Sequence, residues 1–301
     1  MSQITAVVLT FNEEIHLERC LHSISKLTDR IVVVDSFSTD STISIAEQFN
    51  ATILQKVWEN NHALQFNWAL DQLRLEPTDW ILRIDADEIL TDELISEIRQ
   101  KVPLLSSNIH GVNFGRKITF QRKLIRFGGV GKNIVSRLFR YGYGRSQSHW
   151  MDEHIKVSGD IVTFKGSIID DNLNNLTWWT AKHNNYASRE AVELLIIQFL
   201  ELRKDEGGVA ENRGSLRPKR WIKEVVYSKL PFGVRAFCYF FYRYFFLLGF
   251  LDGSKGFEFH FLQGFWYRYL VDAKVIEVIE CAKRESISVK DAIKRVLGIT
   301  L

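Results

Sequence analysis

The chain has 301 residues, of which 46% are hydrophobic and 25% charged, the balance of an ordinary soluble globular protein with a sizeable core. A formal net charge of +3 is too small to indicate a nucleic-acid partner. The three cysteines, Cys20, Cys238 and Cys281, indicate neither a disulfide framework nor a zinc site, and they favour a reducing, cytoplasmic compartment.

The first hundred residues alternate between strand and helix patterns. Strands are expected at 4–11, 31–35, 51–54 and 80–84, and helices at 12–25, around 43–49 and at 62–73. The first run, ITAVVLTF, is too short for a secretory signal and lacks a basic flank, so it indicates a strand covered on both faces. This alternation predicts a mostly parallel α/β sheet with right-handed crossovers.

Polar residues stand where three of these strands end. They are Asn12, Asp35 and the pair Asp85/Asp87. Because ligands of such sheets bind beyond the carboxyl ends of the strands, we expect these side chains to converge on one edge. Two carboxylates one residue apart suit Mg²⁺ or Mn²⁺, which prefer oxygen ligands and share them with substrate phosphates. Taken alone, such a D-x-D pair is more often a solvated turn, and Asp35 a turn cap.

Four motifs give these strand ends a more specific meaning. They are VVLTFNEE (7–14), VVVDSFSTDST (32–42), Gln65-x-Asn67-x-Ala69-Leu70 and WILRIDADEIL (80–90). In this order and spacing the chain resembles glycosyltransferase family 2, and within it the bacterial enzymes that build lipopolysaccharide core or other surface glycans. The resemblance implies a GT-A fold, which is a Rossmann-like, mostly parallel α/β sheet, and sugar transfer with inversion.

The same resemblance implies roles for individual residues. Thr10, Phe11, Asn12 and Glu14 would lie against the nucleoside, Asp35 would accept from the uracil N3–H, and Gln65 and Asn67 would lie beside the donor. Asp85 would approach the ribose or the metal, and Asp87 would ligate the Mg²⁺ or Mn²⁺ that bridges the two phosphates of a UDP-sugar. Such a cation stabilises the charge of the departing diphosphate.

Inversion by a single displacement also needs a base beside the acceptor hydroxyl. The resemblance indicates Glu153, with Asp152 as the alternative. Arg137 and Arg140 are open to two interpretations, contact with a pyrophosphate or charged acceptor and ordinary surface charge. His16 and His22 are expected at the surface of the first helix.

The remaining sequence predicts the domain organisation. We expect a GT-A catalytic domain over 1–170, with a nucleotide-sugar half at 1–105 and an acceptor side at 106–170, followed by a helical region over 171–301. A helix is expected at 176–203 and an exposed loop at 204–220.

The aromatic run 237–251 is too short to span a bilayer and contains Arg243. It fits a buried helix of the C-terminal region, or an interfacial or oligomer-forming helix. With the basic residues from Arg217 onward, the segment 217–251 suits peripheral contact with an anionic leaflet.

Together these observations predict an inverting, metal-dependent glycosyltransferase. It would move a hexose or N-acetylhexosamine from a UDP-sugar to a hydroxyl of a bacterial surface glycan, such as lipopolysaccharide core, capsule or a lipid-linked oligosaccharide. We expect it in the cytoplasm or on the inner face of the cytoplasmic membrane. One alternative is a sugar nucleotidyltransferase, although no Gly-rich phosphate loop follows the first strand. The other is a non-catalytic sugar-nucleotide-binding protein, against which stand the D-x-D pair and the carboxylates at 152 and 153.

Overall fold

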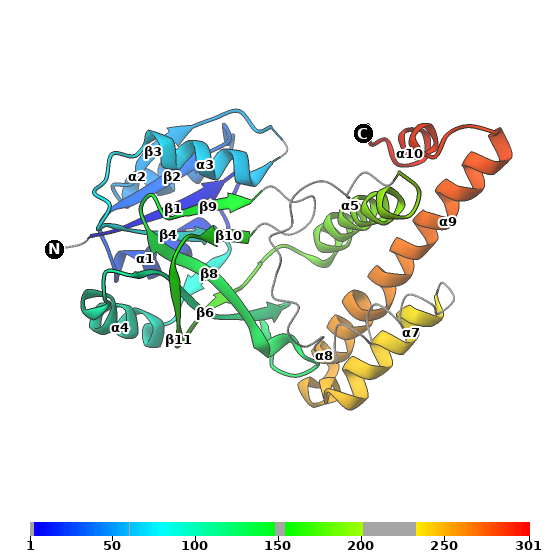
Figure 1. The fold of residues 1–301 in the computed structure, drawn as a ribbon. Helices are drawn as coiled ribbons and strands as arrows, with labels where there is room; N and C mark the ends of the chain where they lie inside the picture. Colours follow the sequence, from blue (N-terminus) through cyan, green and yellow to red (C-terminus); the bar gives the residue numbers. More distant parts are fainter. Residues whose placement is uncertain (1–2, 60, 148–153, 201–232) are drawn as a thin grey trace. The chain divides into compact units, whose positions relative to one another are not determined.

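The computed structural model describes residues 3–59, 61–147, 154–200 and 233–301. Contacts divide the chain into two compact units, Met1–Asn174 and Asn175–Leu301. The first unit is an α/β sheet and the second is helical (Figure 1). The functional meaning assigned to 1–105, 106–170 and 171–301 stays a prediction.

The first half of the α/β unit is the parallel sheet that the sequence predicts. Its strands are β1 (Ile4–Thr10), β2 (Ile31–Asp35), β3 (Thr52–Gln55) and β4 (Trp80–Asp85), in the order β3-β2-β1-β4. Helices α1 (Leu17–Ser25), α2 (Thr42–Gln48) and α4 (Asp92–Lys101) cover one face, and α3 (His62–Gln72) covers the other. Successive residues of a strand point to opposite faces, so Val8 of β1 packs with Leu21 of α1 while Val7 packs with Phe66 of α3.

The first helix begins later than its apolar pattern suggests. We expected it from Asn12, but α1 begins at Leu17. Asn12 adopts the left-handed conformation (φ 54°), and the carbonyl of Glu13 accepts from the N–H groups of both His16 and Leu17 at 2.9 Å. Residues 12–16 therefore form a turn, which leaves their polar groups available to the neighbouring loop.

Further strands extend the sheet beyond β4. They are β5 (Glu88–Leu90), β6 (Ile109–Phe120), β7 (Lys123–Ile125), β8 (Asn133–Arg140) and β11 (Asp160–Asp170), and the order continues β4-β8-β6-β11-β5 with β7 paired to β6. Strand β8 is antiparallel to both β4 and β6, and β5 is antiparallel to β11, while the other strands on this path share one direction. A separate antiparallel pair is formed by β9 (Gly144–Gln147) and β10 (His154–Val157).

The second unit packs around three helices. Helix α5 (Leu176–Leu195) continues into a π-helical turn, η3 (Ile196–Leu200), and packs against α9 (Tyr267–Glu285), which in turn contacts α10 (Val289–Leu297). The core includes Ala191 and Leu195 of α5, Val271 and Val275 of α9, and Ile293 of α10.

Short helical segments complete this unit. They are α7 (Val234–Phe241), η6 (Tyr242–Phe246), η7 (Gly249–Asp252), α8 (Gly253–Phe259) and η8 (His260–Trp266). Within the described residues no single helix has the length and apolarity to cross a bilayer. The stretches Val234–Phe246 and Gly249–Glu285, bent by 71°, meet that criterion of length and composition only as a pair.

Candidate functional site

The carboxyl ends of β1, β2 and β4 meet where the strand order reverses. After β1 the chain proceeds to β2 and β3 on one side and returns to β4 on the other side. The register pairs Thr10 with Asp35 and Leu9 with Asp85, so the polar strand ends are neighbours. A reversal of this kind is where α/β sheets bind ligands.

Asp35 lies at the centre of a buried hydrogen-bond network. Its Oδ1 accepts from the Thr10 hydroxyl (3.1 Å) and from the Ser38 hydroxyl, and its Oδ2 accepts from the Ser38 N–H (2.8 Å). The Gln55 amide is a more distant donor at 3.4 Å. A carboxylate has about four acceptor positions, so a further donor would replace the weakest of these contacts, that of Gln55.

The loop after β1 is joined to the loop after β2. Asn12 donates its N–H to the Ser38 hydroxyl (2.8 Å), and its Oδ1 accepts from the Thr39 N–H (2.9 Å). Glu14 accepts the Ser41 N–H through Oε2 (3.0 Å). These contacts hold Asn12 and Glu14 in the loop framework, and they leave Phe11 exposed at the rim.

A second exposed aromatic residue stands in the loop after β2. Phe37 is 50% exposed and adopts the left-handed backbone conformation (φ 62°). A bulky side chain rarely adopts this conformation, and such strain is concentrated at functional sites. Sequence reasoning did not single out this residue.

Gln65 and Asn67 of α3 point to different places. Gln65 is buried and donates to the Ser36 hydroxyl (2.7 Å) and weakly to the Val34 carbonyl (3.5 Å), so it supports the end of β2. The Asn67 amide makes a matched pair of bonds with the backbone of Ser146 in β9, one to its carbonyl (2.9 Å) and one from its N–H (3.0 Å). Asn67 thus fixes β9 to α3.

A buried charged cluster surrounds Asp85. Arg137 of β8 donates through Nη2 to Asp85 Oδ2 (2.6 Å) and to Glu88 Oε1 (2.8 Å). Although burial acts to raise it, the guanidinium groups of Arg137 and Arg83 hold the pKa of Asp85 well below its usual range. Burial raises the pKa of Glu88 to about 7, with Arg137 opposing this effect and Asp85 adding to it. Asp85 is therefore an ionised carboxylate at neutral pH.

The second aspartate of the pair, Asp87, contacts the segment after β11. It is half-buried, its Oδ2 accepts from the Asn172 amide (3.0 Å), and its carbonyl accepts from the Asp171 N–H (2.9 Å). Asp170 forms an ion pair with Arg116, and burial together with the charge of Asp87 raises the pKa of Asp170. The charges of Asp87 and Asp170 therefore interact across this part of the site.

Comparisons with known proteins identify the family of this chain. The profile of glycosyl transferase family 2 matches residues 5–113, which carry β1, β2 and β4. An uncharacterized glycosyltransferase of Rickettsia prowazekii is 34% identical over 212 residues, which span 65% of this chain and 69% of that protein. This chain belongs to glycosyltransferase family 2. With the mostly parallel sheet and the helical C-terminal unit, membership confirms the GT-A fold class predicted from the sequence.

Other relatives match less of the chain or are less similar to it. The lipopolysaccharide core biosynthesis glycosyltransferase LpsC of Rhizobium meliloti is 28% identical over 199 residues, covering 62% of this chain and 70% of that protein. An uncharacterized glycosyltransferase of Rickettsia felis is 38% identical over 125 residues, so the chain spans only 40% of that relative's length. Among solved structures, glucosyl-3-phosphoglycerate synthase from Mycobacterium tuberculosis, in complex with Mn²⁺ and UDP-glucose, is 24% identical. The match covers 38% of this chain and 44% of the synthase at a TM-score of 0.31. It therefore supports no conclusion about the ligands of this chain.

The residues at the family 2 strand ends suit a divalent cation. Within the described residues no group of three or more His, Cys, Asp or Glu side chains is arranged to hold a metal ion by itself. Mg²⁺ usually takes one or two protein carboxylates and completes its coordination with waters and substrate phosphates. Asp87 meets that requirement better than Asp85, because Arg137 already neutralises Asp85.

The expectation for His16 needs correction, and the position of Arg140 bears on its two interpretations. His16 is buried, not at the surface: its Nδ1 lies 2.6 Å from Glu13 Oε2, and its Nε2 accepts the Leu173 N–H at 2.9 Å. The turn before α1 produces this position, since His16 precedes the helix. Arg140 donates to the carbonyls of Ile109 and Thr78 and lies over the Trp80 ring, at the opposite end of β4 from Asp85.

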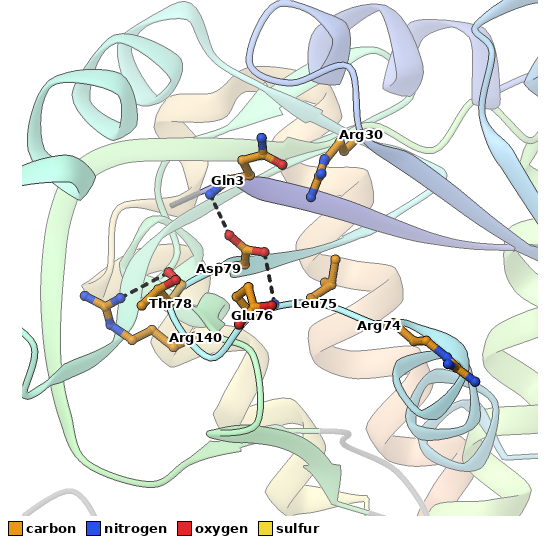
Figure 2. A pocket seen from close by; sticks show the side chains of 8 residues that line it. All are labelled: Gln3, Arg30, Arg74, Leu75, Glu76, Thr78, Asp79 and Arg140. Atoms are coloured by element: carbon orange, nitrogen blue, oxygen red, sulfur yellow. Dashed lines mark hydrogen bonds between the residues drawn. The ribbon is translucent and has the colours of Figure 1, made fainter. Parts of the chain in front are cut away.

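Arg140 also lines a cavity of about 740 Å³ at that opposite edge (Figure 2). The other lining residues include Gln3, whose N–H donates to Asp79 Oδ1 at 2.9 Å. This cavity lies at the amino ends of β1 and β4, whereas sheet ligands bind at carboxyl ends, so we assign it no role in the family 2 reaction. The two candidates for the base, Asp152 and Glu153, lie outside the described residues.

Proposed function

We propose that this chain is an inverting, metal-dependent glycosyltransferase that uses a UDP-sugar. The sugar is a hexose or N-acetylhexosamine, and the acceptor is a hydroxyl of a bacterial surface glycan. The observation that carries the proposal is the position of Asp35 and of the Asp85/Asp87 pair at the carboxyl ends of β2 and β4, on either side of β1, where the strand order reverses.

The nucleoside would lie between the loops after β1 and β2. Asp35 offers a buried carboxylate to the uracil N3–H, in place of the 3.4 Å contact from Gln55. Phe11 and Phe37, both exposed, supply rings beside it. Stacking on rings of this kind typically adds about 1–3 kcal/mol per base.

The diphosphate would lie against Asp85 and Asp87. When bound, Mg²⁺ or Mn²⁺ supplies Lewis-acid stabilisation of the charge on the departing diphosphate. Asp87 would hold this cation, and Asn172 orients the Asp87 carboxylate through its amide. Asp85, kept ionised by Arg137 and Arg83, would accept from the ribose hydroxyls or assist Asp87 in holding the cation.

The acceptor hydroxyl needs a base that removes its proton as the new bond forms. We propose Glu153 for this role, with Asp152 as the alternative, because the family motif indicates these two positions. The lipopolysaccharide relative supports a surface-glycan acceptor. A sugar nucleotidyltransferase and a non-catalytic binding protein are the rival functions.

The first test is thermal unfolding with UDP, GDP, dTDP and CDP, each with and without Mn²⁺. A ligand at a hundred times its dissociation constant adds about 2.7 kcal/mol to the free energy of unfolding. We expect a metal-dependent rise with UDP that Asp87→Ala abolishes. Asp29→Ala is the matched control, because Asp29 is an exposed aspartate before β2, at the opposite edge of the sheet.

Incubation with a UDP-sugar distinguishes the rival functions. A transferase releases UDP slowly even without an acceptor, and a binding protein releases none. A nucleotidyltransferase would instead release pyrophosphate from a nucleoside triphosphate. No thermal shift with any of the four nucleotides would contradict the proposed donor class.

A further inference from the structure

The end of β6 and the strand β7 form a hairpin with a concentrated positive charge. We call residues 116–126 the basic hairpin. Five of its eleven residues are basic and none is acidic, whereas the whole chain has 39 basic and 36 acidic residues. The five are Arg116, Lys117, Arg122, Lys123 and Arg126. A local excess of one charge attracts ligands of the opposite charge, so the basic hairpin favours an anionic ligand.

The basic hairpin stands at the edge of the sheet where the candidate site lies. Strand β8 pairs antiparallel with both β4 and β6, so β4 and β6 run in the same direction. Leu82 of β4 and Val112 of β6 both pair with Leu138 of β8, and they therefore mark the same level of the sheet. Beyond that level β4 continues for three residues, to Asp85, and β6 continues for eight, to Phe120. The hairpin thus extends past the end of β4 by five residues, about 16 Å of strand.

Hydrogen bonds join the basic hairpin to the D-x-D pair. Thr119 of β6 donates its hydroxyl to Asp171 Oδ1, and the Asp171 N–H donates to the carbonyl of Asp87 at 2.9 Å. Although burial acts to raise it, hydrogen bonds and the charges of Arg19 and Arg122 lower the pKa of Asp171. The hairpin therefore lies beside the residue that is proposed to hold the cation.

The five positive charges differ in how far they are already neutralised. Arg116 forms ion pairs with Asp170 and Glu88, so its charge belongs to the buried cluster. Lys117 is half-buried and Lys123 is exposed. The ammonium groups of these two lysines have neither a hydrogen bond nor an ion pair with any residue that the structure describes. They are therefore available to a ligand.

The tip of the basic hairpin holds an arginine in a strained conformation. The two-residue loop between Phe120 and Lys123 is Gln121-Arg122, and both of its residues have a positive φ, 49° and 65°. A loop of this kind normally contains Asn and Gly, because other side chains crowd the backbone at positive φ. Arg122 stands in the loop instead, with its side chain exposed. Strained residues concentrate at functional sites, which supports a binding role for Arg122.

The position of the basic hairpin favours the acceptor over the nucleotide. The proposed nucleoside site lies between the loops after β1 and β2, and β2 and β6 lie on opposite sides of β4 in the strand order. The diphosphate is assigned to the cation at Asp87. The charges of Lys117, Arg122 and Lys123 are then left for another anionic group at the same edge, and the acceptor is the other substrate that binds there.

We propose that the basic hairpin binds phosphate or carboxylate groups of the acceptor, which is therefore an anionic glycan. Arg122 and Lys123 hold these groups at the rim, and the acceptor hydroxyl is thereby oriented toward the donor at Asp87. This inference rests on the proposed function, because it names the class of acceptor for the same site.

The test is binding of a fluorescently labelled lipopolysaccharide core oligosaccharide to the full chain, measured by anisotropy without a donor. The anionic form is compared with a neutral form, from which phosphates are removed and in which carboxyl groups are reduced. The informative variant is Arg122→Asn/Lys123→Gln, which removes two exposed charges and places asparagine where a left-handed conformation is needed. The control is Arg30→Gln/Arg74→Gln, which removes two exposed charges at the opposite edge of the sheet (Figure 2).

We expect the unmodified chain and the control to bind the anionic form, more weakly at high salt, and to bind the neutral form about tenfold less. The dissociation constant of Arg122→Asn/Lys123→Gln for the anionic form should rise about five- to tenfold. Its unfolding temperature should be unchanged or higher, and its affinity for UDP with Mn²⁺ should be unchanged. Lys117→Gln should show a smaller loss in the same direction.

Equal affinity for the two forms overturns the inference. So does an equal loss in the control, which would make the effect one of net charge, and so does a loss of UDP affinity in the hairpin variant, which would place the hairpin at the donor. Binding of phosphatidylglycerol vesicles that depends on Arg122 and Lys123, without binding of the oligosaccharide, would assign the hairpin to a membrane instead. A chain that binds no nucleotide contradicts the proposed function itself, whereas a chain that binds UDP but does not distinguish the two oligosaccharides contradicts this inference alone.

Discussion

Arg137 Nη2 lies 2.6 Å from Asp85 Oδ2 and 2.8 Å from Glu88 Oε1, so one buried guanidinium group serves two carboxylates. The three side chains come from β8, β4 and β5, and the antiparallel pairing of β8 with β4 brings them together. Asp85, the first residue of the D-x-D pair, is thus held by a strand that follows it by some fifty residues. Its geometry should depend on Arg137 even though Arg137 lies outside the motif.

Removal of the guanidinium group tests this dependence. We predict that Arg137→Met lowers the free energy of unfolding by about 3–5 kcal/mol, because two carboxylates lose their nearest buried partner and keep only the longer contacts with Arg83 (3.6 Å) and Arg116 (3.4 Å). Since the pKa of Glu88 is already raised to about 7, ionised Glu88 opposes folding increasingly as the pH rises from 4.5 through 7. The loss should therefore be larger at pH 8 than at pH 5.5. Urea unfolding followed by circular dichroism measures both values.

A second variant, Arg137→Met/Glu88→Gln, tests the contribution of the Glu88 charge to this loss. It removes one of the two carboxylate charges that Arg137 balances, so it should regain part of the stability lost at pH 8. If the double variant is no more stable than Arg137→Met, Glu88 does not share the guanidinium in solution.

Phe37 offers a test of function separate from stability. Its left-handed conformation (φ 62°) costs a bulky residue about 1–2 kcal/mol, whereas asparagine tolerates it. We predict that Phe37→Asn keeps or raises the free energy of unfolding but weakens UDP binding several-fold, because the ring at the proposed nucleoside site is lost. Calorimetric titration with UDP and Mn²⁺ measures the affinity.

Leu248→Asn is the matched control for Phe37→Asn. Leu248 has nearly the same backbone conformation (φ 59°) and a similar exposure, but it belongs to the helical unit. It should gain the same stability and leave UDP affinity unchanged. Unaltered UDP affinity in Phe37→Asn would remove Phe37 from the proposed nucleoside site.

The sequence predicted the parallel strands well because each is a short apolar run that ends in a polar residue. Asp35 and Asp85 could be placed at strand ends for that reason. The partner of Asp85 could not be predicted, since periodicity along the chain carries no information about which strand pairs with β4. Arg137 therefore remained open between a pyrophosphate contact and surface charge, and the structure shows it in an ion pair with Asp85.

Turn geometry set the other limit of prediction. The apolar spacing from Ile15 to Ile24 is helical, but the left-handed Asn12 and the turn at Glu13 delay α1 to Leu17. His16 consequently precedes the helix and is buried, and its Nε2 accepts a hydrogen bond from the Leu173 N–H. The position of Asn67 beside the donor stays a prediction, and the structure adds that its amide is bonded to the backbone of Ser146.

The two hydrogen bonds between Asn67 and Ser146 should affect both stability and catalysis. Asn67→Ala removes two hydrogen bonds that fix β9 and should lower the free energy of unfolding by about 1–3 kcal/mol. The chain continues from β9 to positions 152 and 153, where the proposed base lies in the sequence. We therefore expect kcat for sugar transfer to fall more than the affinity for UDP.

Asp71→Asn provides the comparison for Asn67→Ala. It breaks the exposed ion pair between Asp71 and Arg145, which also joins α3 to β9. Exposed pairs of this kind contribute at most about 1 kcal/mol, so kcat and stability should change little. If Asn67→Ala raises the dissociation constant of UDP and leaves kcat unchanged, Asn67 contacts the donor instead of positioning β9.

His260 makes the stability of the helical unit sensitive to acid. It is fully buried in η8, and within the described residues neither ring nitrogen has a hydrogen-bond partner. Burial, with the nearby charge of Arg243, lowers the pKa of His260 to about 4, while Asp252 opposes the shift. Between pH 6.5 and 4 the unfolded chain therefore binds more protons than the folded one, and the free energy of unfolding falls as the pH falls through this window.

We predict that His260→Leu flattens this pH dependence and keeps or raises the stability at pH 7.5, since it removes two unsatisfied buried nitrogens. The measurement is the urea concentration at the midpoint of unfolding, at pH 7.5, 6.0 and 5.0, for the unmodified chain and for His260→Leu. The difference between the two proteins separates the contribution of His260 from that of His183. Burial also lowers the pKa of His183, but His183 is present in both proteins and cancels in the difference. Parallel pH profiles for the unmodified chain and His260→Leu would show that His260 is protonated without cost, and hence that η8 is open to water.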